Sequence, residues 1–208
     1  MDLPDDLELP LERGAPWWYW LGGRPALDFV NTRRERWRRD VETLVTPGDL
    51  AEWLAQAGLV EAPPRVEAAL VPAARELREA IDAGVVALTA RGVPVSADAL
   101  APIDRWLAFA RVPDRLRVGP NGRPALEAGE PADPARHALG VLAHDAARML
   151  GTDERDRVRV CASDTCSARF YDRSRAGRRR WCSMEGCGNV AKARRHRARR
   201  AGDWPRRL

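Results

Sequence analysis

Four cysteines near the C-terminal end of the chain form two pairs whose spacing is typical of a metal site. Four residues separate the members of each pair and fifteen separate the pairs, which gives Cys161-x4-Cys166-x15-Cys182-x4-Cys187. Zn²⁺ prefers four tetrahedral ligands, and soft thiolates suit it. A short loop can bring two sulfurs to one ion, and the longer segment can form a hairpin that returns the second pair. The pattern therefore predicts one structural Zn²⁺, because a catalytic zinc would keep one position open for water.

Two disulfides, or four unrelated thiols, are the alternative interpretations of these cysteines. Disulfides persist in oxidising compartments, but the acidic N-terminal segment MDLPDDLELPLERG has neither the basic nor the apolar region of a secretory signal. No cysteine occurs in the first 160 residues, so chance explains the clustering poorly. No apolar run approaches the roughly 18 residues of a membrane span. We therefore expect a cytoplasmic protein with no membrane partner.

The residues around the cysteines are strongly basic, whereas the rest of the 208-residue chain is mildly acidic. Residues 151–208 contain 17 Lys and Arg against 7 Asp and Glu, a net charge of +10. Residues 1–150 contain 18 Arg against 23 acidic residues, a net charge of −5. Such an asymmetry indicates a polyanionic partner for the basic part.

Residues 190–200 are predicted to form a basic helix, because Ala and Arg are good helix formers. Guanidinium groups bind phosphate oxygens through bidentate, charge-assisted hydrogen bonds, and such a helix on a metal-stiffened module can enter the major groove of DNA. The hairpin predicted over residues 168–182 adds further arginines, among them Arg169. The candidate nucleic-acid-binding residues are Arg173, Arg175, Arg178, Arg179, Arg180, Asn189, Lys192, Arg194, Arg195, His196, Arg197, Arg199 and Arg200.

DNA is not the only partner that this pattern allows. An RNA-binding or ribosome-associated protein is the second interpretation, because Phe170, Tyr171 and Trp181 could stack on bases. A charge run that is merely solvated, or a disordered tail, is the third.

The acidic part of the chain, which must position this module, is expected to be mainly helical. Its apolar residues recur at helical spacing, and an Asn-Gly turn between alternating residues predicts one hairpin. The expected elements are a helix over 47–57 capped by Thr46, a longer helix over about 65–90 that Pro72 should break or kink near its start, a helix from Ser96 to Ala110, a hairpin over 115–127 and a helix from Asp133-Pro134 to Gly151. The predicted fold class is a mainly α (α+β) domain over residues 1–152 with a β-hairpin, and a zinc-ribbon-like module over 155–208 that ends in a basic helix.

Aromatic residues at positions 17–20 precede a segment with two polar side chains, and together they are a candidate ligand pocket: Trp17, Trp18, Trp20, Asp28 and Asn31. Aromatic clusters can line a pocket or an interface, but these could equally cover an open face of the helical core. An enzyme acting on a small molecule here would need a deep polar pocket. Because the sequence has no P-loop, GxGxxG, GxSxG or HExxH motif, we predict no enzyme and no catalytic residue.

The sequence resembles the family with an N-terminal ABATE domain and a C-terminal CGNR zinc finger, described as stress-induced transcription regulators. In the tail the resemblance rests on the four cysteines and on Phe170, Asp172, Ser174, Arg175, Arg178, Arg180, the run 181–184, Gly188, Asn189, Lys192, Arg195, His196 and Arg197. In the body it rests on residues 21–32, LGGRPALDFVNT, and on 46–59. Val190 departs from the family name, which has Arg at this position.

The resemblance implies a cytoplasmic, stress-responsive transcription regulator whose tail, from about residue 155 to 208, binds DNA through the zinc-held helix. The N-terminal domain would then sense a small-molecule effector or mediate self-association as a homodimer. Val190 implies that this protein does not make a contact that the family arginine could make.

Overall fold

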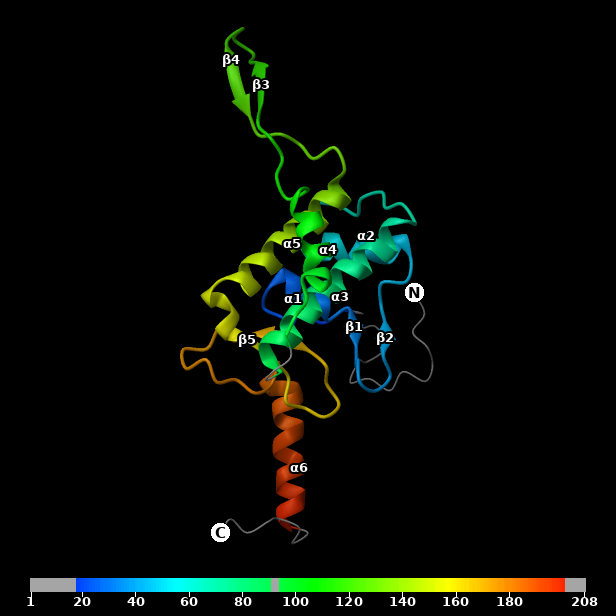
Figure 1. Ribbon diagram of the computed structural model, residues 1–208, viewed down its shortest axis with the longest axis vertical. Helices are drawn as coiled ribbons and strands as arrows, with labels where there is room; N and C mark the ends of the chain where they lie inside the picture. The colour runs from blue at the N-terminus through cyan, green and yellow to red at the C-terminus, as the bar shows by residue number, and fades with distance from the viewer. Residues whose placement is uncertain (1–17, 91–93, 201–208) are drawn as a thin grey trace.

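The computed structural model describes residues 18–90 and 94–200, and within them it is mainly helical (Figure 1). Its helices are α1 (Pro25–Val30), α2 (Pro47–Gln56), α3 (Leu70–Thr89), α4 (Ala97–Leu107), α5 (Pro134–Gly151) and α6 (Asn189–Arg200). Three small antiparallel ribbons pair β1 (Arg33–Arg34) with β2 (Val41–Glu42), β3 (Arg115–Val118) with β4 (Pro124–Glu127) and β5 (Val158–Val160) with β6 (Arg169–Tyr171). The predicted fold class is confirmed. No helix among the described residues is both long and apolar enough to span a membrane.

The main apolar core lies between α1, α2, α3 and α5, with α4 packed against α3 and α5, and a smaller cluster surrounds Phe170 beside the cysteines. The α3 stripe of Leu77, Ile81 and Val85 is fully buried, as its helical spacing predicts. Trp53 of α2 is also fully buried and packs against Phe29 of α1, with ring centroids 5.0 Å apart. These contacts make the helices a rigid platform for the rest of the chain.

The predicted starts of α2, α4 and α5 are confirmed by their caps. Thr46 accepts a hydrogen bond from the Asp49 backbone N–H, and the Asp49 carboxylate accepts one from Thr46 N–H at 2.7 Å, a complete capping box. The Ser96 hydroxyl accepts from Ala99 N–H at the start of α4, and the Asp133 carboxylate accepts from Arg136 N–H at the start of α5. The helix predicted over about 65–90 begins at Leu70, so its predicted start was wrong. Because α3 begins at Leu70, Pro72 lies in the first turn, where no intrahelical N–H is required.

The predicted hairpin around Asn121-Gly122 is confirmed as β3–β4, with Leu116 opposite Leu126. Gly122 has a φ of +72°, the left-handed conformation that this turn requires. Figure 1 shows the hairpin standing away from the helices, and both leucine side chains are largely exposed. It therefore contributes little to the core.

The strand pairing of the cysteine-rich module differs from the prediction. The predicted hairpin paired residues 168–171 with 180–182, whereas β6 pairs with β5, which precedes the first cysteine. The reason is burial: Val158 of β5 is 1% exposed within the helical core, and Phe170 of β6 is fully buried beside the cysteines. Residues 174–177 do form the expected turn, since Gly177 N–H donates to Ser174 O and Gly177 has a φ of +60°.

Candidate metal centre and basic helix

The structure brings the four cysteines together in one cluster. Their sulfur atoms all lie within 4.8 Å of one another, and the Sγ atoms of Cys166 and Cys187 are each 3.8 Å from that of Cys182. A tetrahedron with Zn–S bonds of about 2.3 Å has S···S edges of about 3.8 Å. The donor set and its spacing therefore fit one structural zinc ion held by Cys161, Cys166, Cys182 and Cys187, and the predicted cofactor is confirmed.

Short backbone turns hold each sulfur in place. Cys161 follows β5 directly, and its N–H donates to Ala168 O at 2.9 Å, which closes the loop that carries Cys166. The N–H of Ala168 also points at the Cys166 sulfur, 3.5 Å away. In the second pair, the Ser183 hydroxyl caps a single π turn, Met184–Gly188, that carries Cys187 into the start of α6. The last cysteine and the basic helix are thus joined without a linker.

The crowded thiols cannot all ionise without a cation. Hydrogen bonding from Cys166, Cys182 and Cys187 holds the pKa of the Cys161 thiol far below its usual range. Hydrogen bonding to Cys161 raises the pKa of Cys166 and of Cys182 well above that range. A divalent metal removes this conflict, because coordinated thiols are deprotonated and their charge is neutralised in part. The electrostatics of the cluster agree with its geometry.

Arg169 attaches the module to the helical body and does not face solvent, so the expectation that it contacts phosphate is wrong. It is 4% exposed, and its Nε donates to Asp82 Oδ1 of α3 at 2.7 Å. Its backbone N–H donates to Asn31 Oδ1 at 2.8 Å, and Asn31 Nδ2 donates back to the Arg169 carbonyl at 2.9 Å. The Asn31 amide thus extends the edge of β6 as a further strand residue would. We call Asn31, Asp82 and Arg169 the joint.

The segment LGGRPALDFVNT completes this attachment. Tyr171 N–H of β6 donates to Gly22 O at 2.7 Å, and Gly22 N–H donates to the Asp28 carboxylate at 2.7 Å. A Cβ on Gly22 would lie 2.6 Å from the Asp28 backbone nitrogen, so no larger residue fits. Arg24 binds Asp145 of α5. This segment therefore positions the module against the body.

The predicted ligand pocket of aromatic residues is mostly not a pocket. Trp18 is 4% exposed, and its indole N–H donates to Thr43 Oγ1 at 3.0 Å. Trp20 stacks on Trp53 with ring centroids 5.7 Å apart, and Asp28 is bound to Gly22. Trp17 lies outside the described residues. Of the predicted set, Asn31 lines a cavity, at the junction with the module.

Asp28 gives the stability of the folded protein a measurable pH dependence. Burial raises the pKa of its carboxyl group to about 6 from an ordinary value of 3.8, although hydrogen bonding from Gly22 opposes the shift. Between these two values the folded state keeps a proton that the unfolded chain has lost, so stability falls as the pH rises from about 4 to about 6. Asp28→Asn keeps an acceptor for Gly22 but cannot ionise.

We expect the melting temperature of the wild type, relative to Asp28→Asn, to fall through this pH range and to level off above it. Thermal unfolding followed by circular dichroism, at constant zinc, measures the difference. Processes common to both proteins, including metal loss in acid, cancel in the comparison. A difference that stays constant from pH 4 to pH 7 would contradict this assignment.

Most of the candidate nucleic-acid-binding residues are exposed on α6 and on the loop before it. In Figure 1, α6 projects from the body as a single helix. The exposed residues are Arg173, Arg175, Arg178, Arg180, Asn189, Lys192, Arg194, Arg195, His196 and Arg197. Arg194 is paired with Asp164 at 2.7 Å, and Arg173 donates to Gly23 O. Arg199 and Arg200 belong to α6, but only their backbone is described.

Arg179 is the candidate that turns inward. Its Nη2 donates to the Cys182 carbonyl at 2.7 Å, and its guanidinium lies 5.0 Å from the centre of the Phe170 ring. Its N–H also donates to the buried carboxylate of Asp172. Arg179 therefore supports the second cysteine pair, a role that its charge alone could not indicate.

Comparison with known families assigns both parts of the chain. The profile of the ABATE family, described as "Putative stress-induced transcription regulator", matches residues 23–153. The profile of the CGNR zinc finger matches residues 157–200. No curated protein gives a match. The two matches meet at the 3₁₀ turn Asp153–Arg157, between α5 and β5.

Proposed function

Since this chain belongs to the ABATE family of transcription regulators and carries a CGNR zinc finger, we propose that it is a DNA-binding regulator whose zinc module presents α6 to DNA. Residues 155–208 form the DNA-binding unit, and residues 1–152 form the unit that senses an effector or mediates self-association. The protein acts in the cytoplasm in a stress response and catalyses no reaction.

The observation that carries this proposal is the isolation of α6 together with its charge. The helix packs against the π turn before it and projects from the body (Figure 1). Tertiary packing normally provides most of the stability of a helix. Because α6 has little such packing, most of its surface is left exposed to a partner. At about 1.5 Å per residue it is about 18 Å long, and the major groove, about 12 Å wide, accommodates a helix. Basic side chains would bind the phosphates on both sides of the groove.

The metal centre supplies the rigidity that such a contact needs. Cys187 lies within the π turn from which α6 begins, so the direction of the helix is fixed by the cluster. A zinc ion bound there would hold the two halves of the module together. This chain's own residues make the DNA contact, and Lys192 and Arg195, three positions apart on the exposed side of α6, are the strongest candidates.

Replacing Lys192 or Arg195 with alanine should weaken binding to duplex DNA of any sequence. For each phosphate that is no longer neutralised, the slope of log affinity against log salt should become shallower by about 0.9. Fluorescence anisotropy of labelled DNA at several salt concentrations measures both quantities. Arg105→Ala is the matched control, because Arg105 is an exposed arginine on α4 of the body; its affinity and slope should equal those of the wild type.

The same assay separates DNA from RNA. If structured RNA displaces duplex DNA at equal concentration and the α6 variants weaken both, the protein is an RNA-binding zinc protein and the proposal of an operator-binding regulator is wrong. Preference for the duplex supports the proposal and justifies a search for the specific site.

A further inference from the structure

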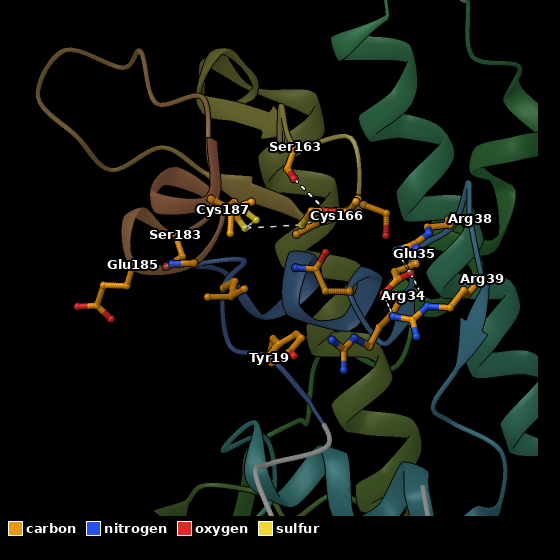
Figure 2. A pocket seen from close by; sticks show the side chains of 18 residues that line it. Tyr19, Arg34, Glu35, Arg38, Arg39, Ser163, Cys166, Ser183, Glu185 and Cys187 are labelled. Atoms are coloured by element: carbon orange, nitrogen blue, oxygen red, sulfur yellow. Dashed lines mark hydrogen bonds and ion pairs between the residues drawn. The ribbon is translucent and has the colours of Figure 1, made fainter. Parts of the chain in front are cut away.

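A pocket of about 480 Å³ lies at the junction of the helical body and the zinc module (Figure 2). Of the residues that the sequence proposed as sites, Asn31 and three of the zinc ligands, Cys166, Cys182 and Cys187, line it. Small-molecule sites usually measure about 300–1,000 Å³ and often lie at the junction of two structural units. Both units line this one. The body supplies residues from Tyr19 to Arg39, and the module supplies residues from Ser163 to Val190.

The wall from the body is basic. Figure 2 shows Arg34, Arg38 and Arg39 on one side of the pocket, across from the cysteines. Glu35 lies among them, but its carboxylate accepts from Arg39 Nε at 2.7 Å and is 3.9 Å from Arg38 Nη1. The carboxylate of Glu185 points away from the pocket in the same view. This wall therefore carries three guanidinium groups against one carboxylate, and its net charge is positive.

The rest of the lining is largely apolar. The guanidinium of Arg34 lies 3.8 Å from the centre of the Tyr19 ring, which forms a flat surface, and Leu21, Ala168 and Val190 are further apolar neighbours. With zinc bound, the four thiolates would carry a net negative charge on the opposite wall. An anionic group would therefore be directed to the arginines, and the apolar part of the same molecule toward Leu21 and Val190.

We propose that this pocket binds an amphipathic organic anion, a carboxylate on an aromatic or aliphatic body, and that binding there regulates the contact of α6 with DNA. The regulatory part rests on the proposed function, whereas the binding site does not. Val190 is in the first turn of α6, and its side chain lines the pocket. A ligand that touches both Val190 and the arginines of the body couples the start of α6 to the body. By linkage, DNA and ligand then change each other's affinity by the same factor.

The test uses the full-length, zinc-loaded protein and the probe 2-naphthoate, with 2-naphthylmethylammonium as the probe of opposite charge. Isothermal titration calorimetry without DNA should give one naphthoate site per chain and no binding of the ammonium. Val190→Glu places a longer, negatively charged side chain at the pocket and should weaken naphthoate binding by at least about tenfold, which corresponds to 1.4 kcal/mol.

Two further variants keep the test independent of folding. Ala193→Glu adds the same side chain to the same helix, at an exposed position outside the pocket, and should bind naphthoate as the wild type does. Arg38→Gln removes a charge from the pocket wall at a side chain that is 58% exposed, and should weaken binding of naphthoate without loss of zinc. Equal binding of both probes, no binding of naphthoate, or wild-type affinity in Val190→Glu and Arg38→Gln would each overturn the proposed site.

A DNA titration with and without saturating naphthoate tests the regulatory part. We expect DNA affinity to change by at least about fivefold, the lower end of typical coupling between sites. Unchanged DNA affinity in a protein that binds naphthoate would overturn regulation and leave the site. Absence of DNA binding in the ligand-free, zinc-loaded protein at low salt would instead contradict the proposed function, whatever the calorimetry gives.

Discussion

Replacement of Asp82 by leucine is expected to lower the free energy of unfolding by about 3–5 kcal/mol, because it leaves a buried guanidinium without its counter-charge. Arg169 is 4% exposed, and besides Asp82 its guanidinium has the Ser167 carbonyl and the Trp37 ring as neighbours. Neither neighbour carries a charge. Urea unfolding at constant zinc measures the loss. Hydrogen exchange should also rise at β6, where the module meets α3.

Replacement of Arg169, the other member of the ion pair, should lower the free energy of unfolding by less than replacement of Asp82. This difference makes the prediction specific to the joint. In Arg169→Met the carboxylate of Asp82 keeps Arg36 at 3.3 Å and is 12% exposed. We therefore expect a smaller loss, by at least about 1 kcal/mol. The double variant Asp82→Leu/Arg169→Met should resemble Arg169→Met, since no unpaired buried charge remains. If Asp82→Leu is no worse than Arg169→Met, the ion pair does not hold the module on the body.

Replacement of Cys182 by serine is expected to abolish zinc binding and to reduce affinity for DNA by roughly 100-fold, or about 2.7 kcal/mol. The Cys182 sulfur lies 3.8 Å from the sulfurs of both Cys166 and Cys187, and Cys182 is 4% exposed, so it is a buried member of the cluster. In structural zinc sites the free energy of metal binding stabilises the folded state, by on the order of 10 kcal/mol, because the unfolded chain has no preformed site. Without the metal, the segment that leads into α6 should lose its fixed direction.

Zinc content by elemental analysis and DNA affinity by anisotropy are the two measurements. Ser163→Ala is the control, because Ser163 belongs to the loop of the first cysteine pair and its hydroxyl bonds to that of Thr165 rather than to a cysteine. It should keep one zinc per chain. Loss of zinc in Cys182→Ser with unchanged DNA affinity would show that the basic residues bind DNA without the fold of the module.

The structural features that could be predicted from the sequence are those that depend on residues close together in the chain. The four cysteines share one ion whatever the path of the chain between them, so their spacing was sufficient. The starts of α2, α4 and α5 were predictable because Thr46, Ser96 and Asp133 cap helices through contacts within three residues. The hairpin of β3 and β4 depends on its own turn.

The joint could not be predicted, because it is formed by positions far apart in the chain. Arg169 resembles any other arginine of a basic tail, and only the approach of Asn31 and Asp82 makes it a buried side chain. The pairing of β6 with β5 has the same origin, since it depends on the burial of Val158 in the body's core. The sequence did contain a partial signal. Gly22 and Gly23, in the same segment as Asp28 and Asn31, indicate that another part of the backbone lies close by, and the backbone of β6 is attached at Gly22.

The pocket could not be predicted either, since its two walls come from residues 19–39 and 163–190. The aromatic segment indicated the correct region, but the side chains from it that line the pocket are Tyr19 and Leu21 rather than the tryptophans. Trp18 and Trp20 instead pack with Thr43 and Trp53.

The most direct test of the proposed function is the affinity of the full-length protein for duplex DNA over a series of salt concentrations, with zinc bound and after removal by a chelator. We predict binding that requires zinc and a steep log–log slope, about −0.9 for each phosphate neutralised. Binding of equal strength after zinc removal would contradict the proposal, because the arginines would then act as an unstructured polycation. So would the absence of binding at low salt with zinc present.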